Sequence, residues 1–209
     1  MPYKGPRHIL SENRKTGWSI DLPLKGHCRP TVNCAKACYA KRGPQSWPLP
    51  VRKHLWMSQY LAGPDISRLI DECRHLRAVR LSGSGDLLEA HVPNLISLAK
   101  ECHKTRFWGM TRKVEIAQLI NNARLTNLRL LVTVDPTSTL DTWNHRGKLC
   151  FGPRHPQDRV PRDSRILAVF PAHYSGRVES GMTRHQKDCP GVWHETSGCL
   201  ACGRCFSWW

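Results

Sequence analysis

The chain has 209 residues, with 32 Lys and Arg against 16 Asp and Glu, which gives a formal net charge of +16. This length predicts one domain with at most a small appendage, large enough to bury a core without disulfides. The mean hydropathy of -0.48, with no apolar run near the roughly 20 residues needed to cross a bilayer, excludes a membrane-spanning protein.

The middle of the chain predicts strands that alternate with helices. Apolar residues at helical spacing predict helices over residues 66–76, 93–102 and 112–122. Short apolar runs predict strands over residues 78–82, 106–110, 128–134 and 165–171, with residues 18–22 as a candidate fifth. The stretch from Thr137 to Arg165 has little periodicity, so we expect no regular structure there.

Strands separated by single helices indicate βαβ units and a parallel sheet with right-handed crossovers. The fold class is therefore α/β, and the strands are too few for an eight-stranded barrel. We expect a partial (β/α) barrel or an open parallel sheet. The chain is divided into a basic N-terminal segment (1–63), a β/α core (64–175) and a cysteine-rich C-terminal segment (176–209), forming one compact domain overall.

In such a fold, ligands bind where the parallel strands end. Asp86 and Asp135 each follow a predicted strand, and their carboxylates are candidates for a metal ion or a ribose hydroxyl. The turn Ser82-Gly83-Ser84-Gly85-Asp86 has glycines that allow backbone amides to approach an anion or a cofactor, or that simply permit a tight turn. Both interpretations of the turn remain open from the sequence.

Ten cysteines in a chain without an apolar leader need an explanation. We expect a cytoplasmic location (host cytoplasm if the protein is phage-encoded), where clustered cysteines more often bind metal than form disulfides. Cys73, Cys102 and Cys150 are isolated and are expected to pack as small apolar groups. The other seven form one group near each end of the chain.

The C-terminal group contains Cys189, Cys199, Cys202 and Cys205. Each Cys-x-x-Cys turn aims two thiolates at one centre, so these four residues are candidate ligands of a single metal site. Tetrahedral zinc and an iron–sulfur cluster both fit, and the consecutive Cys-x₂-Cys-x₂-Cys spacing favours iron–sulfur.

The N-terminal group contains Cys28, Cys34 and Cys38. Three thiolates suit a [4Fe–4S] cluster with one open iron, or zinc with His27 as the fourth ligand. The two groups are also candidates for a shared centre, because a barrel brings its two ends together. The spacing differs from the Cys-x₃-Cys-x₂-Cys pattern of most radical S-adenosylmethionine enzymes.

Four sequence features together resemble the gene product 88 family of tailed phages and actinobacteria. They are Lys15-Thr16-Gly17, the run from Cys28 to Cys38-Tyr39-Ala40, Arg80-Leu81-Ser82-Gly83-Ser84-Gly85-Asp86-Leu87, and the C-terminal cysteines. This resemblance implies a radical-SAM-like (β/α) scaffold with a cluster near the strand ends. The resemblance implies no established activity. If the protein is an enzyme, we expect the open iron at Cys28, Cys34 and Cys38 to bind a cofactor such as S-adenosylmethionine, whose amino-acid end the turn Ser82–Asp86 would hold.

The positive charge is concentrated at the N-terminus: residues 1–63 hold 11 Lys and Arg against 2 Asp and Glu, a local charge of +9. A surplus of this size favours a polyanionic partner, and DNA or RNA is the commonest. We therefore expect an iron–sulfur protein that binds or acts on nucleic acid; the alternative is a non-enzymatic nucleic-acid-binding protein stabilised by zinc. The candidate phosphate contacts are Lys36, Lys41, Arg42, Arg52, Lys53, Arg154, Arg159 and Arg162.

Overall fold

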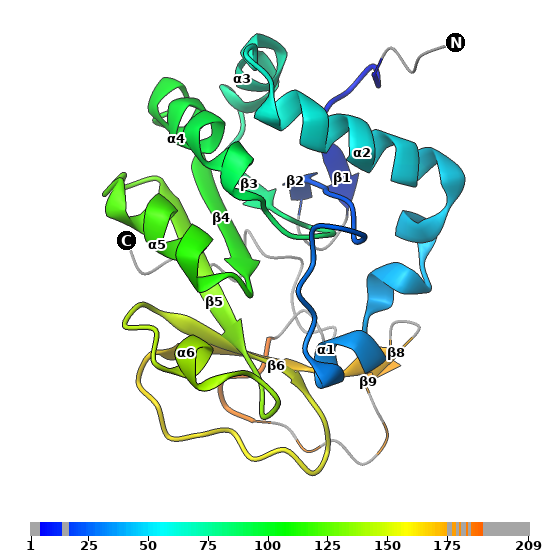
Figure 1. The fold of residues 1–209 in the computed structure, drawn as a ribbon, viewed down its shortest axis with the longest axis vertical. Coiled ribbons are helices and arrows are strands. Elements are labelled where there is room, and N and C mark those ends of the chain that lie inside the picture. Colours follow the sequence, from blue (N-terminus) through cyan, green and yellow to red (C-terminus); the bar gives the residue numbers. More distant parts are fainter. Residues whose placement is uncertain are drawn as a thin grey trace.

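A computed structural model shows one seven-stranded sheet whose strand order follows the chain (Figure 1). It describes residues 5–13, 17–174, 177–178, 180, 183 and 185–189. The strands are β1 (Ser11–Asn13), β2 (Gly17–Ile20), β3 (Ala78–Leu81), β4 (Arg106–Thr111), β5 (Leu128–Val134), β6 (Leu149–Arg154) and β7 (Ile166–Pro171). Neighbours from β2 to β7 are parallel and β1 is antiparallel to β2. A separate antiparallel pair consists of β8 (His173–Tyr174) and β9 (Arg177–Val178).

The helices cover one face of this sheet (Figure 1). They are α1 (Val32–Lys36), α2 (Pro48–Ala62), α3 (Ser67–Cys73), α4 (Val92–Glu101), α5 (Val114–Asn122) and α6 (Leu140–Trp143), with 3₁₀ turns η1 (Tyr39–Lys41), η2 (Pro44–Ser46) and η3 (Glu89–His91). Each parallel neighbour is also the next strand in the chain, so right-handed crossovers place successive helices on the same side. None of the described helices is long and apolar enough to span a bilayer.

The core lies between the sheet and α2–α5. Alternate residues of β5 enter it, from Leu128 to Val134, because successive strand side chains point to opposite faces. From the helices, Leu61 on α2, Leu98 on α4 and Ile120 on α5 are completely buried against them. The α/β class and the open, mostly parallel sheet predicted from the sequence are confirmed.

The four predicted strands and the candidate strand at residues 18–22 are present as β3, β4, β5, β7 and β2. The prediction of no regular structure from Thr137 to Arg165 is wrong, since α6 and β6 lie there. Gly152 and Pro153 interrupt the apolar pattern of β6, and pairing with β5 and β7 defines the strand instead. The sequence pattern also does not predict α2, which begins with proline at its first turn, where the missing N–H costs nothing.

Candidate metal and ligand site at the carboxyl edge of the sheet

The parallel strands end at one edge of the sheet, where charged residues follow β3, β4 and β5. Asp86 follows β3 and accepts hydrogen bonds from the backbone N–H of Leu87 (2.8 Å) and of Arg112 (3.2 Å). Arg112 follows β4, and its Nη2 lies 2.9 Å from an oxygen of Asp135, which follows β5. The two carboxylates are thus linked through Arg112 across three neighbouring strands.

The segment that carries the three N-terminal cysteines crosses this edge. Its anchor is Thr31, whose hydroxyl donates to the Asp135 carboxylate at 2.5 Å and accepts from the backbone N–H of Cys34 at 3.2 Å. Thr31 is therefore the N-cap of α1 and the contact between α1 and the sheet. Farther along, the Tyr39 hydroxyl donates to the carbonyl of Gly83. These contacts hold the three cysteines over the ends of the parallel strands.

Cys28, Cys34 and Cys38 are all half-buried and close enough to influence one another electrostatically. Burial, and then negative charge on Asp86, Cys34 and Cys38, raises the pKa of Cys28 to about 12. Burial also raises the pKa of Cys34, although the positive charge of Arg112 opposes the shift. Burial therefore favours the protonated thiol at Cys28 and at Cys34.

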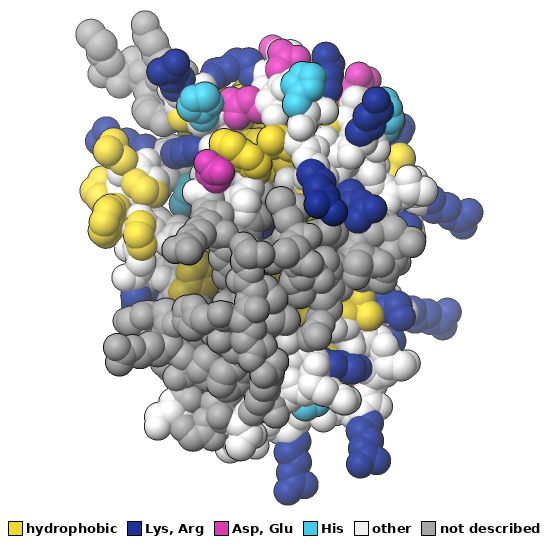
Figure 2. Space-filling view, turned by 180° about the vertical axis from the view of Figure 1, so that it is seen from behind, with side chains coloured by type: hydrophobic (Ala, Val, Ile, Leu, Met, Phe, Trp, Pro, Cys, Tyr) yellow, Lys and Arg dark blue, Asp and Glu magenta, His cyan; other side chains and the backbone are white. Residues whose placement is uncertain are grey.

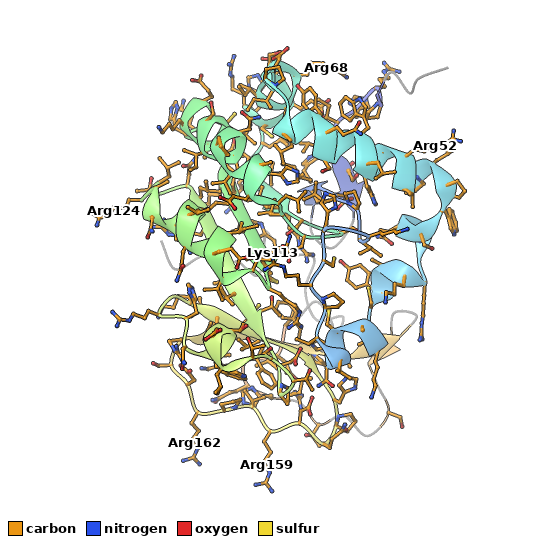
Figure 3. The ribbon with its side chains drawn as sticks, viewed as in Figure 1. Arg52, Arg68, Lys113, Arg124, Arg159 and Arg162 are labelled. Atoms are coloured by element: carbon orange, nitrogen blue, oxygen red, sulfur yellow. The ribbon has the colours of Figure 1, made fainter. Side chains whose placement is uncertain are left out.

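Two cations lie at this edge near the cysteines: Lys113 is buried and Arg112 is half-buried. The Lys113 side chain is directed from the start of α5 toward the cysteine-bearing segment (Figure 3). This residue is only 4% exposed, and its ammonium donates to the carbonyl of Leu87 at 2.5 Å. Burial lowers the pKa of Lys113, while neighbouring Asp86 and Cys28 oppose that shift. Together, Arg112 and Lys113 can compensate negative charge on thiolates or on an anionic ligand at this edge.

A buried hydrogen-bond chain positions the start of the cysteine segment. The backbone N–H of Leu88 donates to Nδ1 of His91, so the proton of His91 is on Nε2, 3.1 Å from the hydroxyl of Ser58. Ser58 in turn lies 2.7 Å from Nε2 of His27, whose Nδ1 is 3.3 Å from the carbonyl of Lys25. Both ring nitrogens of His27 are therefore engaged, and neither is left to act as a zinc ligand beside Cys28.

The glycine turn packs against the chain that leaves β2. A Cβ on Gly83 would lie 2.4 Å from an Asp21 carboxylate oxygen, and one on Gly85 would lie 2.3 Å from the carbonyl oxygen of Leu22. Close packing against the chain that leaves β2 therefore explains why both positions are glycine. The Ser84 hydroxyl is buried and, within the described part of the chain, has no hydrogen-bond partner. Binding of a cofactor at this turn stays a prediction.

Of the four C-terminal cysteines, the structure describes Cys189. Cys189 is buried, and its backbone N–H donates to the carbonyl of Val169 at 2.7 Å, beside β7. Cys199, Cys202 and Cys205 lie outside the described residues. Within the residues described, no three His, Cys, Asp or Glu side chains lie close enough together to hold a metal ion, and this includes Cys28, Cys34 and Cys38.

The expected phosphate contacts do not form one surface. Arg52 points outward near one end of the molecule, whereas Arg159 and Arg162 point outward at the other (Figure 3). The expectation for Arg154 is wrong, because its buried guanidinium pairs with Asp188 at 3.2 Å and is unavailable to a phosphate. Lys53 is half-buried and donates to the carbonyl of Leu10 at 2.8 Å. The remaining expected contacts are exposed: Lys36, Lys41 and Arg42.

Sequence reasoning missed the roles of Lys113, Ser58 and His91. Arg112 and Lys113 directly follow a predicted strand, and that position was a usable signal. No local signal marks Ser58 or His91, since they meet His27 only through the packing of α2 and η3 against the cysteine segment.

Comparison with known proteins identifies the family. A sequence model described as gene product 88 matches residues 3–207, nearly the whole chain. No curated protein and no solved structure matches the sequence. With its core, its glycine turn and both cysteine groups inside the matched region, the chain belongs to the gene product 88 family.

Proposed function

We propose that the protein binds an iron–sulfur cluster through Cys28, Cys34 and Cys38, and that it binds or acts on nucleic acid. The observation that carries the first part is the position of these three cysteines. One segment carries all three, half-buried, over the carboxyl ends of parallel strands, where α/β folds bind their ligands.

The chemistry of the three side chains suits such a cluster, although in this structure they are not gathered closely enough around one point to hold a metal ion. Thiolates are the usual protein ligands of iron–sulfur clusters, and three of them leave one iron for another ligand. When bound, a cluster supplies electron transfer or a coordination position for a small molecule. A positive charge such as that of Arg112 beside Cys34 is the kind of feature that tunes a cluster's potential. The buried ammonium of Lys113 offsets the negative charge that three thiolates introduce.

Metal analysis of protein purified under nitrogen tests this proposal. We expect a brown protein with iron and sulfide, and large losses of iron in Cys28→Ser, Cys34→Ser and Cys38→Ser. Cys73→Ala and Cys102→Ala are matched controls, because both thiols are buried in the core away from this edge. A colourless protein that contains zinc and loses it in the same three variants would support the zinc alternative and overturn the iron–sulfur assignment.

A second measurement separates an enzyme from a scaffold. If one iron is open, S-adenosylmethionine added to the reduced protein will change its electron paramagnetic resonance signal. Asp86→Asn, at the glycine turn, will weaken that response without removing iron. If S-adenosylmethionine does not change the electron paramagnetic resonance signal, a protein group such as a C-terminal cysteine occupies the coordination position on the fourth iron. The protein would then be structural or electron-transferring.

The nucleic-acid part of the proposal rests on charge. The sequence contains no Asp or Glu between Leu22 and Pro64, although this stretch includes all three N-terminal cysteines and seven Lys and Arg. Neutralising about six phosphates would make the logarithm of the affinity for nucleic acid fall with the logarithm of salt concentration, with a slope of about -5. A flat salt response, or no binding of DNA or RNA at low salt, would remove nucleic acid from the proposal.

A further inference from the structure

One side of the molecule carries an unusual share of exposed apolar residues. α1, η1, η2 and the first half of α2 follow one another along this side, which we call the α1–α2 ridge (residues 32–55; Figure 1). Of the eight large hydrophobic residues exposed in the described chain, six belong to the ridge. They are Val32, Tyr39, Trp47, Leu49, Val51 and Leu55. Trp47 is 62% exposed and Leu49 is 72% exposed, so both are free to contact a partner.

The same ridge is strongly cationic. Its exposed charged residues are Lys36, Lys41, Arg42 and Arg52, and it contains no acidic residue. Seen from behind, hydrophobic side chains cluster at this edge of the molecule, with Lys and Arg side chains beside them (Figure 2). Exposed apolar side chains concentrated on one segment indicate an interaction surface, and the cations among them favour a partner that also supplies negative charge.

We propose that the α1–α2 ridge binds single-stranded nucleic acid, with Trp47 stacking on a base and the ridge cations contacting phosphates. This inference rests on the proposed nucleic-acid function and specifies its ligand. A single strand offers an apolar base face and a negative charge at every nucleotide, which matches the mixed chemistry of the ridge. A duplex hides its base faces in the stack and would leave the apolar side chains without partners.

The arrangement of the apolar residues does not suit a helix lying on a membrane. Such a helix needs its apolar side chains on one face. Leu49 and Val51 are two positions apart on α2, so they point about 200° apart around the helix axis. Val32, Tyr39 and Trp47 come from outside α2 altogether.

The ridge is continuous with the cysteine site. Lys36 lies between Cys34 and Cys38, and Lys41 follows Cys38 by three residues. A nucleic-acid strand bound along the ridge would therefore extend to the carboxyl edge of the sheet. This continuity favours a ligand of the cysteine site over an unrelated protein partner.

Binding of labelled oligo(dT) and oligo(U), compared with a duplex of the same length by fluorescence anisotropy, tests the proposal. We expect the single strands to bind at least about tenfold more tightly than the duplex. Trp47→Ala weakens that binding about tenfold, and Trp47→Phe restores most of it. Leu140→Ala removes a side chain that is 79% exposed on α6 and serves as the matched control, with no change.

The charge contribution is tested with two matched pairs. Lys41→Gln with Arg52→Gln removes two ridge charges and should reduce the slope of log affinity against log salt by about 1.4. Lys104→Gln with Arg124→Gln removes two exposed charges away from the ridge and should leave the slope unchanged. Folding of each variant is checked by circular dichroism, and iron content is measured in the same samples.

Several outcomes would overturn the inference. They are equal binding of duplex and single strand, full binding by Trp47→Ala, or equal effects of the two charge pairs. Trp47-dependent binding to phosphatidylserine vesicles or to an acidic peptide, without binding to oligonucleotides, would assign the ridge to that partner instead. Nucleic-acid binding that ignores the ridge would refute this inference and leave the proposed function intact. Absence of any nucleic-acid binding would refute both, whatever the iron content.

Discussion

The guanidinium of Arg112 and the carboxylate of Asp135 form an ion pair 2.9 Å long beneath α1, with the Asp135 side chain completely buried. The pair joins the ends of β4 and β5, and through the hydroxyl of Thr31 it also holds the segment with Cys34. Arg112 donates in addition to the carbonyl of Gly152 on β6 at 2.8 Å. This one ion pair therefore connects three parallel strands to the candidate metal site.

Replacing Arg112 with methionine should destabilise the protein substantially. The change leaves the buried Asp135 carboxylate without its cation, and breaking a buried pair costs about 3 kcal/mol. Urea unfolding followed by circular dichroism measures the loss. Arg124→Met is the matched control, because Arg124 points outward beyond α5 (Figure 3). Equal free energies of unfolding for the two variants would contradict the importance of the pair.

Replacing Gly85 with alanine should cost more stability than replacing Gly26. Both glycines have positive φ, +73° and +77°, so alanine is strained at either position. A Cβ at Gly26 meets nothing within 4 Å, whereas one at Gly85 runs into the backbone of Leu22. We expect a loss of about 1 kcal/mol for Gly26→Ala from the backbone alone. For Gly85→Ala we expect about 2–4 kcal/mol, since overpacking adds to the strain. Thermal unfolding of the two variants measures these losses of stability. Equal losses would show that the glycine turn can move away from Leu22 to accommodate the added Cβ.

Acid should destabilise the protein through His91. Burial, followed by the charge of His27, lowers the pKa of His91 to about 4. The unfolded chain therefore binds a proton below about pH 6.5 that the folded chain does not bind until about pH 4. Its contribution to the free energy of unfolding is complete above about pH 6.5 and is lost as pH falls from there toward 4, by up to about 3 kcal/mol.

The His91 contribution is measured by urea unfolding at a series of pH values. His91→Gln should be less stable than the wild type at neutral pH, because it disturbs the hydrogen bonds to Ser58 and Leu88, but it should show a shallower decline in acid. The exposed residue His75 provides the control, since His75→Gln should preserve the wild-type slope. A wild-type slope in His91→Gln would rule out this origin of the acid sensitivity.

Metal binding should depend on the C-terminal cysteines and not on the isolated cysteine Cys150. Cys199→Ser and Cys202→Ser are expected to lose metal and stability, because metal affinity at a site absent from the unfolded chain becomes folding free energy. Cys150→Ala should retain the full metal content, since that thiol lies inside the sheet, 3.2 Å from the hydroxyl of Thr133. Metal analysis by mass spectrometry gives the equivalents per chain. Full retention of metal in both serine variants would exclude these cysteines as ligands.

The sequence by itself determined the α/β class, four strands and three helices, and the two cysteine groups. These depend on local patterns: apolar runs for β5 and β7, helical spacing for α4 and α5, and short intervals between ligands. It also determined that Asp86 and Asp135 follow strands. Parallel strands bring the residues that follow them to one edge of the sheet, so the proximity of Asp86 and Asp135 follows from the topology.

Only the tertiary structure decided how that edge is built. The sequence did not predict β6, because pairing with β5 and β7 overrides its Gly-Pro interruption. Arg154 matched the pattern of a phosphate contact, but a fold contact with Asp188, far along the chain, buries it. Likewise, His27 matched the pattern of a zinc ligand, but the Ser58 hydroxyl and the Lys25 carbonyl occupy its two ring nitrogens. Burial and pairing of charged groups depend on residues distant in sequence, and these long-range contacts are what periodicity and spacing do not encode.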